Sequence, residues 1–273
     1  MSQLTTRTER EFSLTDWLQS EKFRSELQLA APRDVQAGRF ARIALTLAKT
    51  NPKLMECEAR SVLNAVMLCA QTGLEPGPLG HAAIIPRGGK AVWQPMYRGM
   101  LHLMHRSQQI ASVQCGVVRE KDHFEYDEGS DPHVKWQRAL VPEADRGDRV
   151  CAFACIIPRD GKPYVRVMHW EDVMAHRDRY VPARMRESGP WVNEIEQMAM
   201  KTVLKSVGKL APISIETQVA ISYDDLGEIG KGQPDVLPPD FDADRTPDSY
   251  CNKPMSDDGL ICSRDVGHAG ECE

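Results

Sequence analysis

A heptapeptide occurs twice in this chain with a single residue changed. Residues 84–90 read Ile-Ile-Pro-Arg-Gly-Gly-Lys, and residues 156–162 read Ile-Ile-Pro-Arg-Asp-Gly-Lys. Gly-Gly and Asp-Gly provide the positive φ angles that two-residue hairpin turns require, and β-prone runs flank both copies. Each copy is therefore predicted to be the tip of a hairpin, so the middle of the chain pairs its strands antiparallel. The arginine and lysine of each tip are either ordinary solvated charges or cations held toward a polyanion.

The remaining pattern places helices on both sides of this β-rich middle. Apolar spacing predicts an early helix capped by Ser13 or Thr15, and further helices over residues 35–49, 59–72, 170–180 and 190–210. Strands, with a short helix over 97–107, are predicted over residues 81–86, 91–96, 110–119, 124–127, 133–136, 149–158 and 163–169. This order predicts an α+β fold with a helical N-terminal part, a central and largely antiparallel β-sheet, and C-terminal helices.

The composition changes near residue 227. Residues 227–249 contain Pro234, Pro238, Pro239 and Pro247 among many aspartates, which is typical of a linker. A chain of 273 residues is long enough for one main domain with appendages. We therefore predict a main domain over residues 1–226, a Pro/Asp-rich linker over 227–249 and a flexible acidic tail over 250–273.

The formal net charge of −5 conceals an uneven distribution. Residues 223–273 carry 13 acidic and 4 basic side chains, which leaves 30 basic and 26 acidic side chains for residues 1–222. The basic excess concentrates in residues 80–121, where Glu120 alone opposes Arg87, Lys90, Arg98, Arg106, Arg119 and Lys121. The sequence therefore predicts an anion-binding surface on the main domain and a tail that repels phosphate.

The chain has neither a signal peptide at its N-terminus nor an apolar run long enough for a membrane span, so we expect a cytoplasmic protein. Thiols stay reduced in that compartment. Five of the eight cysteines lie within or beside apolar segments and are predicted to be core residues: Cys57, Cys69, Cys115, Cys151 and Cys155.

The other three cysteines lie in the acidic tail with a histidine. Cys251, Cys262, His268 and Cys272 are separated by 10, 5 and 3 residues, and four such ligands suit a tetrahedral structural zinc site. Against zinc, the first gap is longer than the usual spacing of a ligand pair, and no Cys-x-x-Cys motif is present. The alternative is a disordered tail that binds a protein partner.

The loop that binds nucleotide phosphates in many ATPases is missing from this sequence. Such a loop ends in Gly-Lys-Ser/Thr, whereas the Gly-Lys pairs here are followed by Ala91, Pro163, Leu210 and Gly232. A metal-dependent nuclease is an alternative, because acidic residues cluster around Asp122 and Glu125. The simpler interpretation is that this acidic cluster lies on a solvated strand and loop.

The predicted helix over residues 190–210 has two distinct faces. One face is apolar at four-residue spacing, and another carries Lys201, Lys205 and Lys209. Four helical residues rise about 6 Å, which is comparable to the phosphate spacing of an extended strand. These lysines are therefore either contacts to a DNA backbone or partners of the C-terminal helix dipole.

Five motifs follow one another along the chain in a specific order. They read Ala-Gln-Thr-Gly-Leu-Glu-Pro-Gly-Pro-Leu-Gly-His (70–81), Tyr-Arg-Gly-Met (97–100), His-Arg-Ser-Gln-Gln-Ile-Ala-Ser (105–112), Val-Val-Arg-Glu-Lys-Asp-His-Phe-Glu-Tyr (117–126) and Gly-Pro-Trp-Val (189–192). In these motifs the chain resembles the RecT family of phage single-strand annealing proteins. The resemblance runs from about residue 20 to residue 224.

The resemblance implies ATP-independent annealing of complementary DNA strands by a protein that is not an enzyme and needs no cofactor for annealing. It also implies an α+β core with a basic DNA groove, and assembly into rings or helical filaments on single-stranded DNA and annealed duplex. The implied partners are a phage 5′→3′ exonuclease and the single-strand-binding protein of the bacterial host. A passive single-strand DNA-binding protein is a further alternative.

Annealing requires that two polyanions approach while their bases stay free to pair. A groove that neutralises phosphates without reading bases meets both conditions. Aromatic side chains beside cations favour single-stranded DNA, because bases stack on them. We predict Trp93 and Tyr97 as stacking or groove-wall residues and the following phosphate contacts: Arg87, Lys90, Arg98, Arg106, Lys201 and Lys205.

Overall fold

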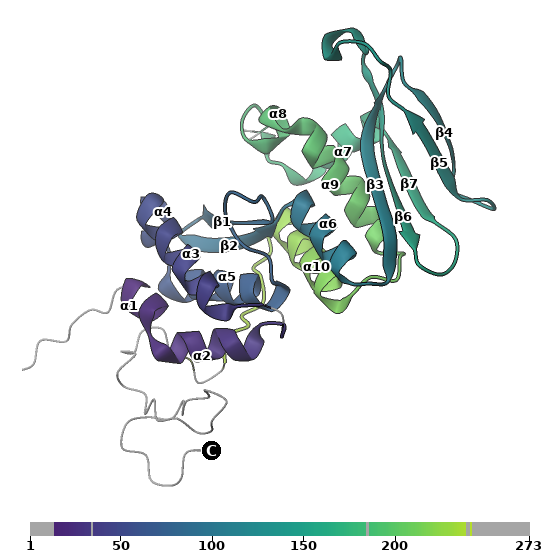
Figure 1. Ribbon diagram of the computed structural model, residues 1–273. Helices are drawn as coiled ribbons and strands as arrows, with labels where there is room; N and C mark the ends of the chain where they lie inside the picture. The colour runs from purple at the N-terminus through teal and green to yellow at the C-terminus, as the bar shows by residue number, and fades with distance from the viewer. Residues whose placement is uncertain (1–13, 34, 184–185, 239–240, 242–273) are drawn as a thin grey trace, which may run out of the picture. The chain divides into compact units, whose positions relative to one another are not determined.

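The computed structural model describes residues 14–33, 35–183, 186–238 and 241, and these divide into two compact units (Figure 1). The first unit contains the described residues up to Pro76, the segment 84–93, and the described residues from Asp235 onward. The second unit contains residues 77–83 and the described residues from Gln94 to Pro234. The chain therefore leaves and re-enters the first unit twice.

The first unit is mainly helical. Its helices are α1 (Leu14–Gln19), α2 (Glu21–Ala30), α3 (Ala37–Thr50), α4 (Pro52–Met55) and α5 (Ala59–Thr72). The Ser20 hydroxyl caps α2 by accepting the Phe23 N–H at 3.2 Å, and α5 ends at Gly73, whose φ of +68° suits glycine. Helix α5 is the most buried of these helices, and it forms the centre of the unit.

The hairpin of β1 (Ala82–Arg87) and β2 (Lys90–Pro95) carries the first heptapeptide. Gly88 and Gly89 connect its strands with φ angles of +57° and +79°, so this copy forms the predicted two-residue turn. The second heptapeptide also ends a hairpin, but its loop spans residues 159–163, and Gly161 has a φ of +105°. Both copies are hairpin tips, as predicted, although only the first is a two-residue turn.

The described residues after Pro234 pack against the helices of the first unit. The Asn64 side chain accepts the Val236 N–H at 2.8 Å, and Arg60 forms an ion pair with Asp235. Phe241 is buried, and its ring lies 4.7 Å from that of Trp17. Part of the segment predicted as a linker therefore belongs to a packed unit.

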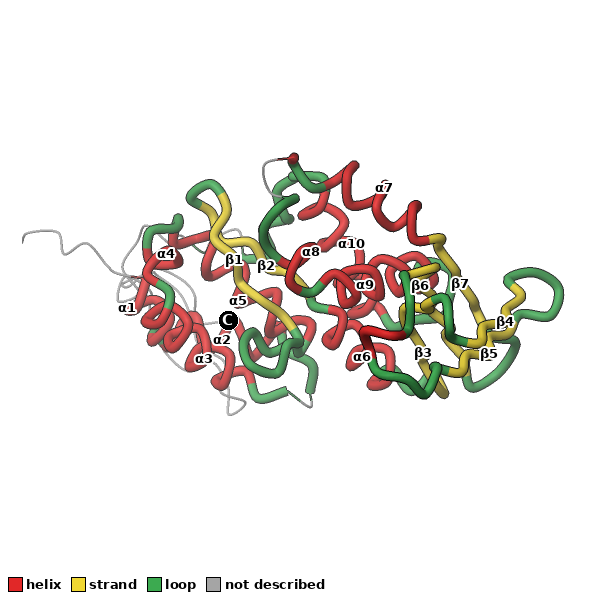
Figure 2. The backbone as a smooth tube through the Cα atoms, turned by 90° about the horizontal axis from the view of Figure 1, so that it is seen from above, coloured by secondary structure: helices red, strands yellow, loops and turns green. Residues whose placement is uncertain are grey.

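The second unit combines helices with two antiparallel sheets (Figure 2). The strands β3 (Ile110–Arg119), β6 (Arg149–Pro158) and β7 (Tyr164–His169) form one sheet in the order β3-β6-β7. The strands β4 (His123–Asp127) and β5 (His133–Gln137) form a separate hairpin. The predicted central sheet is therefore antiparallel, but β3 pairs with the distant β6 and not with its neighbour in sequence.

The helices of this unit are α6 (Tyr97–Arg106), α7 (Trp170–Tyr180), α8 (Pro190–Asn193), α9 (Ile195–Gly208) and α10 (Ile215–Glu228), with a short 3₁₀ helix at Glu143–Asp145. Helix α9 packs on the three-stranded sheet and shares a core with α6 and α10. The predicted helix over 190–210 is therefore two helices that break at Glu194. Helix α10 was not predicted, and it runs two residues into the predicted linker.

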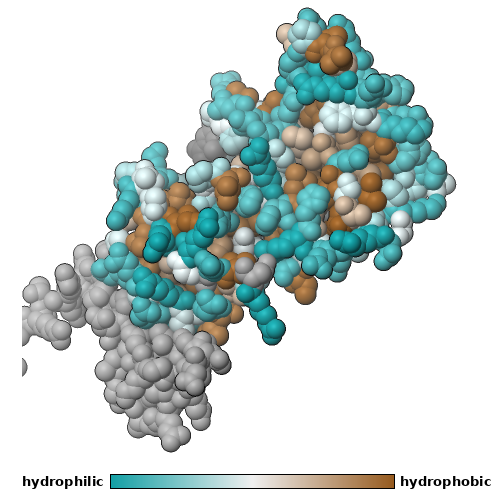
Figure 3. All heavy atoms as spheres, in the orientation of Figure 1, coloured by the Kyte–Doolittle hydropathy of each residue, from teal (hydrophilic) through white to brown (hydrophobic). Residues whose placement is uncertain are grey.

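Cys57, Cys69, Cys151 and Cys155 are buried, and Cys115 is partly buried, which confirms their predicted place in apolar surroundings. Burial raises the pKa of the thiols of Cys115 and Cys151 to about 11. Among the described residues, no helix is long and apolar enough to span a membrane. Hydrophilic and hydrophobic side chains are interspersed over the face in Figure 3.

Candidate nucleic-acid interface

The tip of the first hairpin exposes both of its cations. Arg87 and Lys90 are exposed on either side of the glycine turn. The Lys90 Nζ lies 3.5 Å from a carboxylate oxygen of Glu58, and the Glu58 N–H donates to the carbonyl of Gly89 at 2.9 Å. These contacts hold the tip against the start of α5 and leave the guanidinium of Arg87 on the surface.

Trp93 does not lie where a stacking residue would have to lie. Its side chain is only 1% exposed, because Ala91 and Trp93 share the buried face of β2. The Trp93 indole lies beside the buried Cys69 thiol within the first unit. The prediction that Trp93 stacks on bases or forms a groove wall is therefore wrong for this conformation, and Trp93 is a core residue.

The second hairpin is tied into its own unit. The Lys162 ammonium donates to the Ser130 carbonyl at 2.9 Å, and the Arg159 N–H donates to the Gln109 carbonyl at 2.9 Å. These bonds connect the loop between β6 and β7 with the segments that follow β4 and α6. They favour a sheet turn for this copy of the heptapeptide.

Helix α6 carries three of the predicted contacts on its accessible side. Arg98 is exposed, whereas Tyr97 and Arg106 are half-buried. Gly99 lets α6 pack closely on the loop that precedes β1, because a Cβ at this position would lie 2.0 Å from the carbonyl oxygen of His81. Because glycine has no side chain, the first turn of α6, which carries Tyr97 and Arg98, lies close to the backbone of that loop.

Lys201 and Lys205 lie inside the protein and not on its surface. Their side chains are 3% and 5% exposed, and both ammonium groups bind Asp224 of α10, at 2.6 and 2.7 Å. The Lys205 ammonium also lies 2.8 Å from carboxylate oxygens of Asp225 and Glu228. Their assignment to DNA phosphates is therefore corrected, because helix α10 supplies the negative charge that we expected from DNA.

The pKa values of this buried cluster follow from its geometry. Burial alone would lower the pKa of Lys205, but the charges of Asp224 and Glu228 and the hydrogen bonds to Asp224 and Asp225 raise it above its usual range. Burial would raise the pKa of Glu228, but a hydrogen bond from His176 and the charge of Lys205 lower it to about 2. Lys205 and Glu228 are therefore both charged at neutral pH, and the contacts of Asp224 and Glu228 with Lys205 and of Glu228 with His176 join α9 to α10 and α7.

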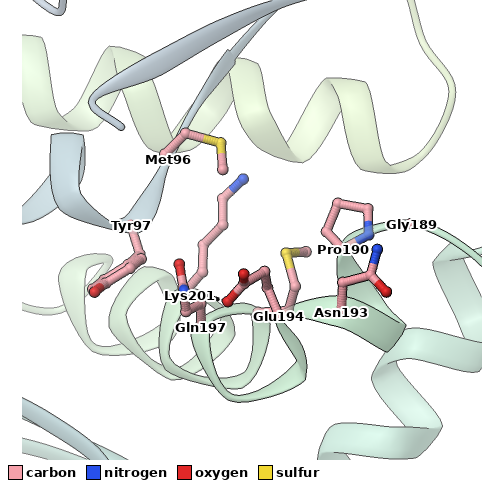
Figure 4. A pocket seen from close by; sticks show the side chains of 9 residues that line it. Met96, Tyr97, Gly189, Pro190, Asn193, Glu194, Gln197 and Lys201 are labelled. Atoms are coloured by element: carbon pink, nitrogen blue, oxygen red, sulfur yellow. Dashed lines mark hydrogen bonds between the residues drawn. The ribbon is translucent and has the colours of Figure 1, made fainter. Parts of the chain in front are cut away.

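A cavity of about 330 Å³ lies where two of the sequence motifs meet (Figure 4). Tyr97 and Met96 border it on one side, and Pro190 and Asn193 border it on the other. Its floor comes from α9 and includes Gln197, whose amide donates to the Glu194 carboxylate. An aromatic ring, thioethers and amides are groups that contact nucleobases by stacking and hydrogen bonding.

The backbone of the Gly-Pro-Trp-Val motif explains this wall of the cavity. Gly189 has a φ of +82°, which favours glycine, and Pro190 occupies the first position of α8. Trp191 points into the core with 8% exposure. The motif therefore anchors α8 through Trp191 and presents Pro190 and Asn193 to the cavity.

The carboxylates of the nuclease alternative do not converge. Both oxygens of Asp122 are occupied, because they accept hydrogen bonds from Arg146, the Trp136 indole, and the backbone N–H groups of Arg119 and Ala139. Glu125 lies exposed on β4 and pairs with Lys135 at 3.0 Å. Within the described part of the chain, no three side chains among His, Cys, Asp and Glu are grouped to hold a metal ion.

The tail ligands Cys251, Cys262, His268 and Cys272 lie outside the described residues.

A family model described as RecT family matches residues 38–237. The chain belongs to the RecT family. The matched residues include both motifs that border the cavity in the second unit and residues 235–237 of the segment that packs back on the first unit.

Two curated relatives align with most of the length of this chain. The chain is 34% identical over 220 residues to Protein RecT of Escherichia coli (strain K12), which covers 77% of this chain and 79% of that protein. It is 26% identical over 194 residues to the Uncharacterized protein YqaK of Bacillus subtilis (strain 168), covering 70% and 65% of the two chains.

Proposed function

We propose that this protein binds single-stranded DNA and anneals complementary strands during homologous recombination, without hydrolysing ATP. Membership of the RecT family is the observation that carries this proposal, because the match over residues 38–237 includes the whole of the second unit and nearly all of α3, α4 and α5 in the first. The sequence supports ATP independence, since none of its Gly-Lys pairs is followed by serine or threonine. The protein acts as a DNA-binding scaffold, and base pairing between the strands supplies the sequence selection.

The surface groups give this scaffold a physical basis. Arg87 and Lys90 on the first unit, and Arg98 and Arg106 on the second, are the cations that we assign to phosphates. Tyr97 lines the cavity, and it is the residue that we assign to stacking with a base. Contacts of this kind bind any sequence and leave the other bases free to test pairing.

An annealing assay without ATP tests the proposal. Two complementary labelled oligonucleotides should pair faster in the presence of the protein, with no shortening of either strand. Arg98→Glu should slow annealing and reduce the log–log salt dependence of binding by roughly 0.7 for each phosphate that the variant no longer neutralises. Arg179→Glu is the matched control, because Arg179 is exposed on α7 and has no ion pair among the described residues.

The same assay separates the alternatives. Wild-type annealing by Arg98→Glu would contradict the groove assignment. Magnesium-dependent shortening of the strands would support the nuclease alternative, and binding without faster pairing would identify a passive single-strand-binding protein.

The two hairpins give a second comparison. Replacing Arg87 and Lys90 by alanine should weaken DNA binding more than replacing Arg159 and Lys162, because Lys162 already donates to a backbone carbonyl. Equal reductions in affinity would show that the exposed charge of the first tip does not define the DNA surface.

The protein's assembly and partners follow from the same proposal. We propose that it self-assembles into rings or helical filaments on single-stranded DNA and annealed duplex, in the cytoplasm of the bacterial host. It cooperates there with a phage 5′→3′ exonuclease and the host single-strand-binding protein. Electron microscopy with and without DNA tests assembly, and co-purification of each partner tests the interactions.

The tail is proposed to hold a structural zinc ion between Cys251, Cys262, His268 and Cys272, because three thiolates and an imidazole suit tetrahedral zinc. Protein purified without chelator should contain about one zinc ion per chain. The Cys262→Ser variant should lose the metal and keep annealing. Metal analysis without zinc would leave a partner-binding acidic tail as the remaining interpretation.

A further inference from the structure

The first unit has a groove that the proposed function does not use. The groove has a volume of about 720 Å³ and lies beside the first half of α3, next to the end of α1 and the start of α2. Three arginine and three large aliphatic side chains are among the residues that line it: Arg24, Arg39, Arg42, Leu18, Ile43 and Leu45. A partner for this groove needs both carboxylates and apolar side chains.

One arginine of the groove has no carboxylate partner in the part of the chain that the structure describes. Arg24 pairs with Glu21 at 3.0 Å, and Arg39 pairs with Glu75 at 2.7 Å. Arg42 is exposed and forms no ion pair among the described residues. It lies next to Ile43, which is only half-buried, so an unpaired cation and an aliphatic surface are adjacent.

The C-terminal part of the chain enters this same region. Phe241 is 1% exposed, and its ring lies 4.7 Å from that of Trp17 and 5.9 Å from that of Phe23. The residues that follow these two ring partners in the sequence, Leu18 and Arg24, line the groove. Phe241, the last described residue, therefore lies against α1 and α2, two of the helices that also line the groove.

One segment of this chain has the chemistry that the groove requires. Residues 255–261 read Met-Ser-Asp-Asp-Gly-Leu-Ile, which places two adjacent carboxylates beside two adjacent aliphatic side chains. We propose that this segment docks in the groove of its own chain, with Asp257 or Asp258 on Arg42 and with Leu260 and Ile261 against the aliphatic positions.

The tether makes such a weak contact effective. The 13 residues from 242 to 254 connect Phe241 to the segment, and at about 3.3–3.6 Å per residue they reach roughly 45 Å. A 14-residue helix such as α3 is about 21 Å long, so reach does not limit docking. Short flexible tethers give effective concentrations in the millimolar range, on the order of the dissociation constant of a few exposed contacts.

Docking of this segment would cover Arg42 and place an acidic stretch over the groove. It would lower the attraction of the first unit for other polyanions, and a competing ligand would have to displace it first. The tail would then be an internal occupant of the groove, in addition to any external partner that it binds.

Carbodiimide cross-linking of the full-length chain tests this proposal, because it joins only carboxylates and amines in direct contact. Arg42→Lys keeps the charge and introduces a reactive amine into the groove. The native amines of Lys53 on α4 and Lys121 in the second unit are exposed and serve as internal controls. We expect the amine at position 42 to cross-link to Asp257 or Asp258 with a yield at least about tenfold above either control.

Two further experiments test whether the segment docks on its own chain and whether its aliphatic side chains hold it there. In a mixture of ¹⁴N- and ¹⁵N-labelled protein, the cross-linked peptides should carry a single isotope, because the segment docks on its own chain. Leu260→Ala with Ile261→Ala should remove most of the yield without removing either reacting carboxylate. Equal yields at the control amines, mixed-isotope peptides, or an unchanged yield after the double substitution would each overturn the proposal. No DNA is present, so the result is independent of annealing.

Discussion

Asp224→Asn tests whether buried ion pairs hold α10 to α9. The Asp224 side chain is 2% exposed, and its two oxygens accept from Lys201 at 2.6 Å and from Lys205 at 2.7 Å. Lys205 keeps two other carboxylates within 2.8 Å, those of Asp225 and Glu228. Lys201 has no second ion pair among the described residues, so the substitution leaves it as an uncompensated buried charge.

The expected cost follows from burial. Removing one partner of a buried ion pair destabilises a protein by about 3–5 kcal/mol, which is a large part of a typical stability of about 5–15 kcal/mol. Asp225→Asn is the matched control, because Asp225 is 33% exposed and Lys205 retains Asp224. Solvent screening limits the cost of that control to about 1 kcal/mol.

Urea unfolding and thermal melting measure both variants. A destabilisation of about 3–5 kcal/mol lowers the melting temperature by roughly 6–20 °C for a unit of this size. Adding Lys201→Met to Asp224→Asn should recover part of the stability, because the unpaired ammonium is then absent. A shift no larger than that of Asp225→Asn, or no recovery by Lys201→Met, would refute the reasoning and reopen an external partner for these lysines.

Substitutions at Gly99, Glu228 and Asp122 change three further contacts of the described residues. Gly99→Ala should destabilise the protein by about 3 kcal/mol or more, since the added Cβ would lie 2.0 Å from the His81 carbonyl oxygen. In the same melting experiment, Gly38→Ala should stabilise α3 by up to about 1 kcal/mol, because no atom lies within 4 Å of the added Cβ. The pKa of Glu228 in the folded protein is about 2, below its ordinary value of 4.5, so its contribution to stability is full above pH 4.5 and is lost as the pH falls toward 2. Glu228→Gln should therefore flatten the pH dependence of the urea midpoint in this window. An unchanged slope would contradict the pairing of Glu228 with Lys205. Asp122→Asn should lower the urea midpoint by the equivalent of about 3 kcal/mol, because the Arg146 guanidinium is buried with Asp122. The variant should keep annealing at temperatures below its melting transition. A specific loss of strand cleavage would instead restore the nuclease alternative.

Local patterns were sufficient for most of the secondary structure. The strands 110–119 and 149–158 and the helices 59–72 and 170–180 begin and end where the sequence predicts. Each has a strong periodicity and a clear stop, such as Gly73 after α5. The pairing of β3 with β6 was not predictable in this way, because it joins residues about 40 positions apart and the β4–β5 hairpin lies between them in sequence.

The error at Lys201 and Lys205 came from a missing helix. The segment that precedes α10 contains Gly208 and Pro212, which interrupt the helical pattern, and the apolar residues of α10 do not form a long continuous stripe. Without α10, the lysines had no protein partner. The sequence does contain a signal for α10. Asp224, Asp225 and Glu228 have the spacing of one helical turn, as do the lysines of α9, so the two sets could pair if both segments are helical.

Trp93 illustrates a different source of error. In β2, Ala91, Trp93 and Pro95 alternate with less buried residues, so the period of two already places Trp93 on the inner face. The aromatic ring was assigned to DNA because cations lie near it in the sequence. Strand periodicity outweighs sequence proximity, because neighbouring residues of a strand point to opposite faces.

The two heptapeptides show how far a repeated sequence determines function. Both copies end a hairpin, because Gly88-Gly89 and Gly161 adopt the positive φ angles that their turns need. Their cations nevertheless have different surroundings: Lys90 faces a carboxylate at 3.5 Å on a side chain that is half exposed, whereas Lys162 donates to a backbone carbonyl at 2.9 Å. An ion pair of exposed groups contributes about 0–1 kcal/mol, so a phosphate competes readily for Lys90. A hydrogen bond from Lys162 closes a loop of its own unit, and a phosphate would have to replace it. The same residues therefore give one tip whose lysine faces an exposed carboxylate and one whose lysine bonds to a backbone carbonyl, and the difference lies in the elements that the fold brings beside them.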